Sequence, residues 1–189
     1  MTEATGVEPF MASQGAFTDS ELDNIVAYGD ALRQADATIK GDMDRDEHNS
    51  IRVTRIAWID QKSEVRWLYE KIAAVTWSLN EQTYRFELTA VEKLQYTVYT
   101  GREGSHYDWH IDQGATPRRR KLSLVLQLSQ ASDYEGCELQ IQASNRIETA
   151  PKIRGTLIAF PSYVLHRVTP ITSGVRKSLV IWCSGPRFR

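Results

Sequence analysis

Two segments in the first half of the chain place their apolar residues at the 3.6-residue spacing of an amphipathic helix. The first begins after Thr18, which is spaced to form a capping box with Glu21. Its expected buried face consists of Leu22, Ile25, Val26, Gly29 and Leu32. The second is expected to begin at a capping Ser63. Its expected buried face consists of Leu68, Tyr69, Ile72, Ala73, Thr76 and Leu79. Between the two helices, residues 51–59 alternate and are rich in β-branched side chains, which predicts a strand.

From residue 86 onward the pattern changes to short β-rich runs separated by Gly, Asp, Ser and Pro. The expected strands cover residues 86–88, 94–99, 109–111, 121–128, 138–143, 156–160, 165–168 and 178–183. Many short strands at this spacing are typical of a sandwich or jelly roll. Because the helices come first and the strands follow, we predict an α+β fold in which the N-terminal helices pack on one side of a β-core.

Length and composition fit a single globular domain over residues 1–189. Residues 1–93 are expected to form a mainly helical support with one or two strands, and residues 94–189 the β-core. A formal charge of −1 gives no field that would favour nucleic acid. No apolar run reaches the roughly 20 residues of a membrane span, so no membrane is expected as a partner. With no apolar leader and only two cysteines, a cytoplasmic location is expected.

Residues 35–50 form a polar stretch in which Asp42, Asp44 and Asp46 alternate. An EF-hand loop would need glycine where Glu47 stands and a closing glutamate where Val53 stands, so the calcium interpretation fails. Two interpretations remain for this stretch, a surface loop and a lid over an active site.

The candidate chemistry lies in two His-x-Asp pairs and one later histidine. Residues two apart in a strand point to the same face, so His106–Asp108 and His110–Asp112 each deliver an imidazole and a carboxylate side by side. Strand geometry does not separate the two pairs. With His166, either pair would make a set of two imidazoles and one carboxylate, which suits non-haem Fe(II). Arg176 follows ten positions later and could bind a carboxylate ligand through two hydrogen bonds.

Three groups of motifs in the second half occur in the order of a known family. They are Tyr99-x-Gly101 with Tyr107-x-x-His110-x-Asp112, then Arg120–Ser123 leading to Tyr134–Leu139, then Phe160-Pro161, His166, Gly174-x-Arg176-x-Ser178 and Trp182. The combination resembles the Fe(II)- and 2-oxoglutarate-dependent dioxygenases, in particular the prolyl-4-hydroxylase-like branch that includes bacterial PKHD-type hydroxylases. Cys137 departs from the family, which usually has a glycine there. The resemblance selects His110 over His106 as the metal ligand.

The resemblance implies a double-stranded β-helix catalytic core with Fe(II) bound by His110, Asp112 and His166. Arg176 would pair with the distal carboxylate of 2-oxoglutarate, and Tyr99 and Gln127 would lie beside this cosubstrate. For Tyr99 and Gln127 the alternative is core polarity satisfied by the backbone. Ascorbate is the expected supporting reductant. Halogenating relatives have a small residue at the position of Asp112, so the aspartate favours hydroxylation.

The expected reaction consumes O2 and hydroxylates a prolyl residue in a peptide or protein, with release of succinate and CO2. This substrate is implied by the resemblance alone, and a free amino acid or small molecule is the nearest alternative. A non-catalytic β-barrel module that retains a structural metal is a rival of a different class. Arg176 speaks against that rival, because a structural metal site needs no carboxylate anchor. Nucleic acid is not an expected partner, because residues 176–178 lack the R-x-N pattern of the relatives that demethylate it.

Overall fold

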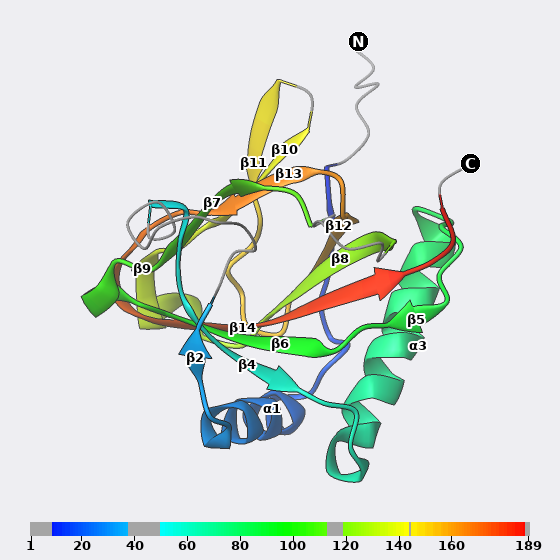
Figure 1. Ribbon diagram of the computed structural model, residues 1–189, viewed down its shortest axis with the longest axis horizontal. Helices are drawn as coiled ribbons and strands as arrows, with labels where there is room; N and C mark the ends of the chain where they lie inside the picture. Colours follow the sequence, from blue (N-terminus) through cyan, green and yellow to red (C-terminus); the bar gives the residue numbers. More distant parts are fainter. Residues whose placement is uncertain (1–8, 38–49, 113–118, 144, 188–189) are drawn as a thin grey trace.

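The computed structural model describes residues 9–37, 50–112, 119–143 and 145–187, which form two antiparallel sheets with helices on one side (Figure 1). The larger sheet has the order β1 (Met11–Ser13), β12 (Leu157–Pro161), β8 (Arg120–Gln127), β14 (Ile171–Ser184), β6 (Leu94–Thr100), β4 (Arg55–Ile59) and β2 (Ala35–Asp36). Two short strands, β5 (Ala90–Val91) and β9 (Tyr134–Gly136), also pair with β14. The smaller sheet has the order β11 (Arg146–Thr149), β10 (Leu139–Ala143), β13 (Leu165–Val168), β7 (His106–His110) and β3 (Arg52–Val53). The predicted double-stranded β-helix core is confirmed.

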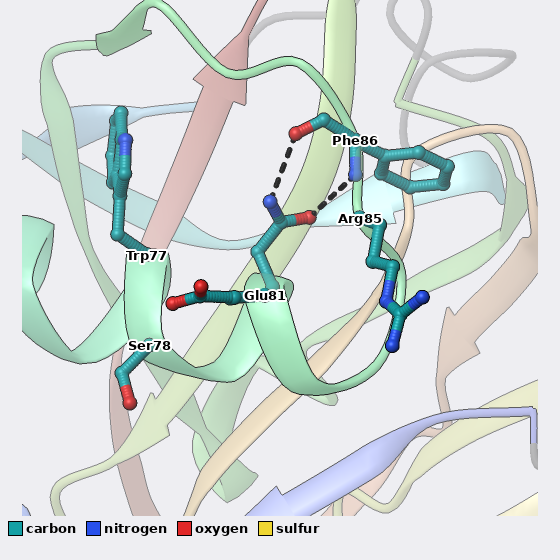
Figure 2. Close-up of a pocket in the computed structure, with 6 residues that line it drawn as sticks. Trp77, Ser78, Glu81, Arg85 and Phe86 are labelled. Atoms are coloured by element: carbon teal, nitrogen blue, oxygen red, sulfur yellow. Dashed lines mark hydrogen bonds between the residues drawn. The ribbon is translucent and has the colours of Figure 1, made fainter.

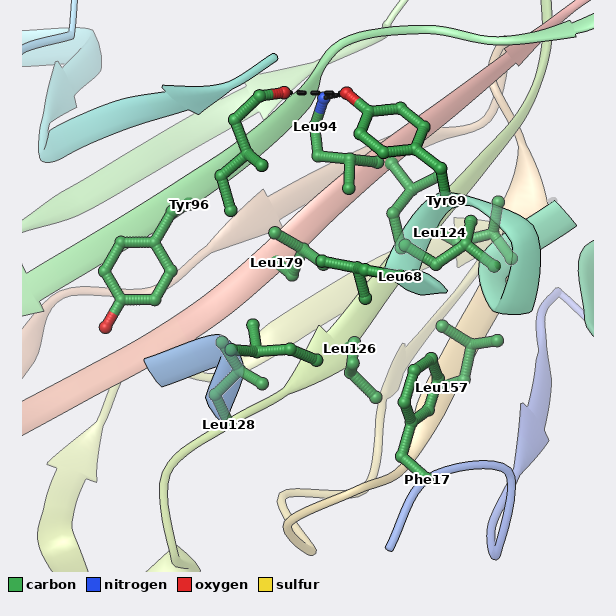
Figure 3. Close-up of a cluster of buried hydrophobic side chains, with 14 of the residues drawn as sticks. Phe17, Leu68, Tyr69, Leu94, Tyr96, Leu124, Leu126, Leu128, Leu157 and Leu179 are labelled. Carbon is green, nitrogen blue, oxygen red and sulfur yellow. Dashed lines mark hydrogen bonds between the residues drawn. The ribbon is translucent and has the colours of Figure 1, made fainter. Parts of the chain in front are cut away.

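Two helices, α1 (Asp19–Ala31) and α3 (Arg66–Gln82), lie on the side of the larger sheet that faces away from the smaller one (Figure 1). Three short 3-10 turns complete the described elements: η1 (Ser63–Val65), η2 (Gly101–Glu103) and η3 (Ala131–Asp133). The helices bury Leu22 and Leu68 against Tyr96, Leu126 and other side chains of the larger sheet (Figure 3). Among the described helices, none has both the length and the apolar composition required to cross a membrane.

Strand β8 divides its residues between the helix-facing core and the space between the two sheets. The face beneath the helices carries Leu122, Leu124 and Leu126. The opposite face, directed at the smaller sheet, carries Ser123, Val125 and Gln127. Strands β6 and β14 alternate in the same way, which places the cross-strand partners Tyr99 and Arg176 on the inner face. The period-2 pattern thus builds the core and the walls of a site at the same time.

Helix α1 begins as predicted. Thr18 accepts a hydrogen bond from the Glu21 N–H, and the Glu21 carboxylate accepts one from the Thr18 N–H at 2.8 Å. Gly29 lets the helix approach the sheet closely, because a Cβ atom there would lie 2.5 Å from the Tyr96 ring. Tyr96 in turn donates a hydrogen bond to the Asp30 carboxylate at 2.8 Å.

The predicted start of the second helix at Ser63 is wrong. Residues Ser63–Val65 form a 3-10 turn, and α3 begins only at Arg66. Ser63 therefore lies inside the first turn, where its hydroxyl contacts the Glu64 carboxylate and caps no backbone N–H. Within α3, the Tyr69 hydroxyl ties the helix to the sheet by donating to the Ile59 carbonyl at 2.7 Å (Figure 3).

The strand predicted at residues 86–88 is also wrong, because a side chain competes for the backbone groups that a strand would need. Asn80, at the end of α3, accepts from the Phe86 N–H at 3.0 Å and donates to the Phe86 carbonyl at 2.9 Å (Figure 2). One amide side chain thus replaces both ladder bonds of Phe86. The nearest strand is the two-residue β5, which begins at Ala90.

The segment before residue 94 contributes more strands than the one or two expected. Its described part contains β1 to β5, four of which have only two or three residues. The single strand predicted over residues 51–59 is split, because β3 joins the smaller sheet and β4 the larger one, with Thr54 between them. Residues 35 and 36 form β2, and Asp42, Asp44 and Asp46 of the polar stretch lie outside the described residues.

Candidate active site

Neighbouring strands of the smaller sheet bring the two candidate histidines together. His110 ends β7, His166 lies in β13, and the two are direct cross-strand partners whose ring centroids are 4.1 Å apart. Asp112 follows β7 and is held by its N–H, which donates to the Ser162 carbonyl at 2.9 Å. Asp112 Oδ1 lies 3.9 Å from His110 Nε2, and Asp112 Oδ2 lies 3.5 Å from His166 Nε2. The turn after β7 therefore places the carboxylate beside both rings.

Backbone carbonyls fix the orientation of both imidazoles. Nδ1 of His110 lies 2.7 Å from the Asp108 carbonyl, and Nδ1 of His166 lies 2.9 Å from the Val164 carbonyl. Because a carbonyl can only accept, each Nδ1 carries the proton, and a neutral ring then has its lone pair on Nε2. Burial and the adjacent His166 lower the pKa of His110 to about 3, so this ring is neutral at pH 7. Both Nε2 atoms are thereby prepared as metal ligands.

Two serines brace the carboxylate of Asp112. Ser123 donates to Asp112 Oδ2 at 2.6 Å, so the Ser162 hydroxyl, 2.9 Å from Ser123 Oγ, must donate to Ser123. Burial alone would raise the pKa of Asp112, but nearby His166 and the Ser123 hydrogen bond contribute to a net lowering. The side chain is thus an ionised acceptor with a fixed direction.

The donor set fits a metal ion. Ligand atoms of His110, Asp112 and His166 all lie within 4.8 Å of one another, and the described residues contain no second group of this kind. Two ligands about 2.1 Å from one ion can be at most about 4.2 Å apart, and both nitrogen–carboxylate separations fall below that limit. Two imidazoles and one carboxylate suit Fe(II) with open positions. The buried indole N–H of Trp182, in the same cavity, makes no hydrogen bond of ordinary length among the described residues, but it lies close enough to Asp112 to help lower the pKa of that carboxyl.

The alternative pair His106–Asp108 does not form such a site. The His106 ring nitrogens lie 3.1 Å from the Gly104 carbonyl and 3.2 Å from the Ser50 carbonyl, so both ring nitrogens are engaged by backbone. Asp108 is exposed. Of the two pairs that the sequence left open, the structure gathers only His110–Asp112 with His166.

A cavity of about 250 Å³ opens beside the three metal-site residues. Most of its lining is aromatic or aliphatic, including Trp58, Tyr107, Phe160 and Trp182. Its lining residues with polar side chains, apart from the three metal-site residues, include Arg52, Gln95, Arg120, Tyr99 and Tyr107. Such a mixture of apolar walls and few polar groups is typical of a small-molecule or side-chain binding site.

Arg176 is a buried cation close to Tyr99, which lines this cavity. It is 1% exposed, and among the described residues it forms no ion pair with a carboxylate. Its Nε and Nη2 donate to Gln127 Oε1 at 3.2 and 2.9 Å, and its Cζ lies 5.4 Å from the Tyr99 ring centroid. Burial raises the pKa of Tyr99 to about 12 and also raises the pKa of Cys137, so neither supplies a negative charge. An anionic ligand would supply the missing charge.

Gln127, expected beside the cosubstrate, contacts Arg176 and the backbone of residue 151. Its Oε1 accepts from Arg176, and its Nε2 donates to the Pro151 carbonyl at 3.1 Å, so both ends of the amide hold protein groups. Gln127 therefore positions Arg176. Tyr99, in contrast, lines the cavity, as does the unassigned Arg52.

Three further site residues escaped the sequence analysis. Ser123 and Ser162 support Asp112, and Arg52 lines the cavity. The position of Ser123 could have been predicted, because it alternates with leucines in β8 and thus faces inward. Ser162 and Arg52 reach the site through pairings between distant segments, which no local pattern reveals.

Comparison with known proteins shows what this chain is similar to. Residues 94–184 match the model described as the 2OG-Fe(II) oxygenase superfamily. A PKHD-type hydroxylase from Synechococcus sp. (strain JA-2-3B'a(2-13)) is 32% identical over 119 residues, which cover 59% of this chain and 53% of the relative. The chain thus spans about half the length of the curated relatives it matches.

Solved structures with the same fold cover nearly the whole chain. A prolyl-4-hydroxylase from Pseudomonas putida is similar with a TM-score of 0.74 and 22% identity, covering 97% of this chain and 95% of that one. A prolyl hydroxylase from Trichoplax adhaerens, in complex with a hypoxia inducible factor peptide fragment, has a TM-score of 0.73 and 19% identity, covering 93% and 83%. At these identities the likeness establishes the fold.

Proposed function

We propose that the protein is an Fe(II)- and 2-oxoglutarate-dependent oxygenase that hydroxylates a C–H bond, because residues 94–184 match the model of the 2OG-Fe(II) oxygenase superfamily. The observation that carries the proposal is the convergence of His110, Asp112 and His166, whose ligand atoms lie within 4.8 Å of one another. In this proposal those three residues hold the Fe(II) through the two Nε2 atoms and the carboxylate. The three ligands are prepared by the fixed Nδ1–H tautomers and by the serine-braced carboxylate.

Bound Fe(II), with 2-oxoglutarate and O2, would supply the oxidising chemistry that adds one oxygen to the substrate and releases succinate and CO2. The chain supplies binding and orientation. Arg176 would bind the distal carboxylate of 2-oxoglutarate, supported by its burial without a counter-charge and by its fork of donors. Gln127 would hold that fork in place, and Tyr99 would contact the cosubstrate from the cavity wall.

The substrate we propose is a prolyl residue in a peptide or protein. Support comes from the names of similar proteins, a PKHD-type hydroxylase and a prolyl hydroxylase in complex with a peptide fragment. It also comes from the edge of the cavity. Trp58 and Ile111 line the cavity and are also 42% and 47% exposed to solvent. These side chains form an apolar rim against which a peptide could lie.

The test is Fe(II)- and O2-dependent formation of succinate from 2-oxoglutarate, with and without proline-containing peptides. If the protein is an oxygenase, wild-type protein should form succinate and the Asp112→Ala variant should form none. If the substrate is a prolyl residue, a proline-containing peptide should raise succinate formation above the level without peptide. The peptide should also gain the mass of one oxygen atom. Succinate that does not respond to peptide would favour a free amino acid or small molecule as the substrate. No succinate from iron-loaded protein would favour the non-catalytic binding module.

A further inference from the structure

Arg52 is a buried arginine that lines the cavity, on a different strand from Arg176. It lies in β3 and is 8% exposed. Its Nε donates to the Thr54 hydroxyl at 3.0 Å and its Nη2 to Gln95 Oε1 at 3.0 Å. Its Cζ lies 4.4 Å from the centroid of the Tyr107 ring. The guanidinium is thus held in one orientation by the Thr54 hydroxyl, the Gln95 amide and one aromatic face.

Among the described residues, Arg52 has no carboxylate partner, whereas Arg120, the other arginine that lines the cavity, has one. Arg120 donates through Nε and Nη2 to the Glu92 carboxylate at 3.1 and 3.0 Å, so its charge is balanced. No carboxylate pairs with Arg52 among the described residues, and the side chains that it contacts, those of Thr54, Gln95 and Tyr107, are neutral. A desolvated cation with only neutral partners is costly, and a bound anion would offset that cost.

Part of the donor capacity of Arg52 and Gln95 remains available to a ligand. Neither hydrogen bond of Arg52 uses Nη1. Gln95 is 4% exposed and lines the cavity, and its Oε1 accepts from Arg52. No hydrogen bond from Gln95 Nε2 is present in the described part of the chain. One guanidinium and one amide would therefore offer N–H groups to the same planar acceptor.

We propose that Arg52 and Gln95 form an anion subsite that binds a carboxylate of the substrate. This inference rests on the proposed function, because it places the carboxylate in the cavity beside the metal-site residues. The Tyr107 ring connects the two places, since its centroid lies 3.4 Å from that of His110 and 4.4 Å from Arg52 Cζ. A cavity of about 250 Å³ with one unbalanced cation fits a small group of single charge. The carboxylate can come from an acidic side chain beside the reacting residue or from the α-carboxylate of a terminal or free amino acid.

The experiment measures binding of charged and neutral probes to the protein loaded with Mn(II) and 2-oxoglutarate, so that no turnover is needed. N-acetylproline is compared with N-acetylprolinamide, which tests the α-carboxylate. N-acetyl-prolyl-glutamate amide is compared with N-acetyl-prolyl-glutamine amide, which tests the side-chain carboxylate. Dissociation constants are read by calorimetry. The variants are Arg52→Gln, Arg52→Lys and the matched control Arg55→Gln, whose side chain is 52% exposed and pairs with Glu103.

We expect wild type to bind one charged probe about ten- to a hundredfold more tightly than its neutral counterpart, the effect of a hydrogen bond to a charged group. Arg52→Gln removes this preference and leaves the affinity for the neutral probe unchanged. Arg52→Lys keeps part of it, because the charge remains without the planar fork. Arg55→Gln retains all of it. The charged probe that is preferred identifies the source of the carboxylate.

Equal binding of charged and neutral probes to wild type, including no binding of either, would overturn the subsite. A preference for the charged probe that persists in Arg52→Gln would also overturn the subsite, whether or not that variant still binds 2-oxoglutarate. Because these readouts are independent of succinate formation, a protein that shows the preference but makes no succinate would refute only the proposed oxygenase activity.

Discussion

The hydrogen bond from Ser123 to Asp112 gives the sharpest test of how the site is prepared for a metal. The Ser123 hydroxyl lies 2.6 Å from Asp112 Oδ2, and the two side chains are 0% and 8% exposed. A hydrogen bond to a charged group contributes about 1.5–3 kcal/mol, which corresponds to about 10- to 150-fold in a binding constant. Removal of a group that supports a metal ligand typically weakens metal binding by about 10- to 100-fold. We therefore expect Ser123→Ala to weaken Mn(II) binding by about 10- to 100-fold.

The assay is a Mn(II) titration of the purified protein, followed by electron paramagnetic resonance of the free ion. Ser178→Ala is the matched control, because Ser178 is a buried serine of β14 with 1% exposure and no described contact with Asp112. Ser162→Ala should cause a smaller loss, since Ser162 acts on the carboxylate only through Ser123. An unchanged Mn(II) dissociation constant in Ser123→Ala, in a protein that still loses Mn(II) binding in Asp112→Ala, would refute the reasoning.

Three further predictions follow from the geometry. His106→Ala should keep Mn(II) binding and His110→Ala should abolish it, because the backbone already engages both ring nitrogens of His106; the reverse result in the same titration would select the other pair. Arg176→Ala should weaken 2-oxoglutarate binding by about tenfold or more, measured by calorimetry with Mn(II) present, and an unchanged affinity would remove its assigned role. Gly29→Ala should lower the free energy of unfolding in urea by about 1–3 kcal/mol, because the new methyl group overlaps the Tyr96 ring; unchanged stability would show that the helix can shift away from the sheet.

The parts of the fold that could be predicted from sequence depend on short-range patterns. The capping box at Thr18 and Glu21 involves groups three residues apart, and the alternating leucines of β8 follow from strand geometry alone. The 3-10 turn at Ser63 and the loop at Phe86 could not be predicted in the same way. At Phe86, the deciding contact is a side-chain amide six residues away that satisfies the backbone better than a strand partner.

The candidate site shows the same division. The spacing of His110 and Asp112 identified two ligands that lie together, although the turn after β7, and not the strand, places Asp112. The resemblance to a known family supplied the distant His166. Arg52 was hidden, because residues 51–59 read as one alternating strand, whereas the chain passes between the two sheets at Thr54. That crossing is decided by pairing with β7, more than fifty residues later in the sequence. Only the assembled sheets show that Arg52 faces the cavity.

A crystal structure of the protein with Mn(II) and 2-oxoglutarate, with anomalous scattering used to locate the metal, tests the central claim most directly. The account predicts one metal peak bound by His110 Nε2, His166 Nε2 and the Asp112 carboxylate, and a distal carboxylate of 2-oxoglutarate hydrogen-bonded to Arg176. A metal peak at His106–Asp108, or a 2-oxoglutarate carboxylate on Arg52 with Arg176 unliganded, would contradict it.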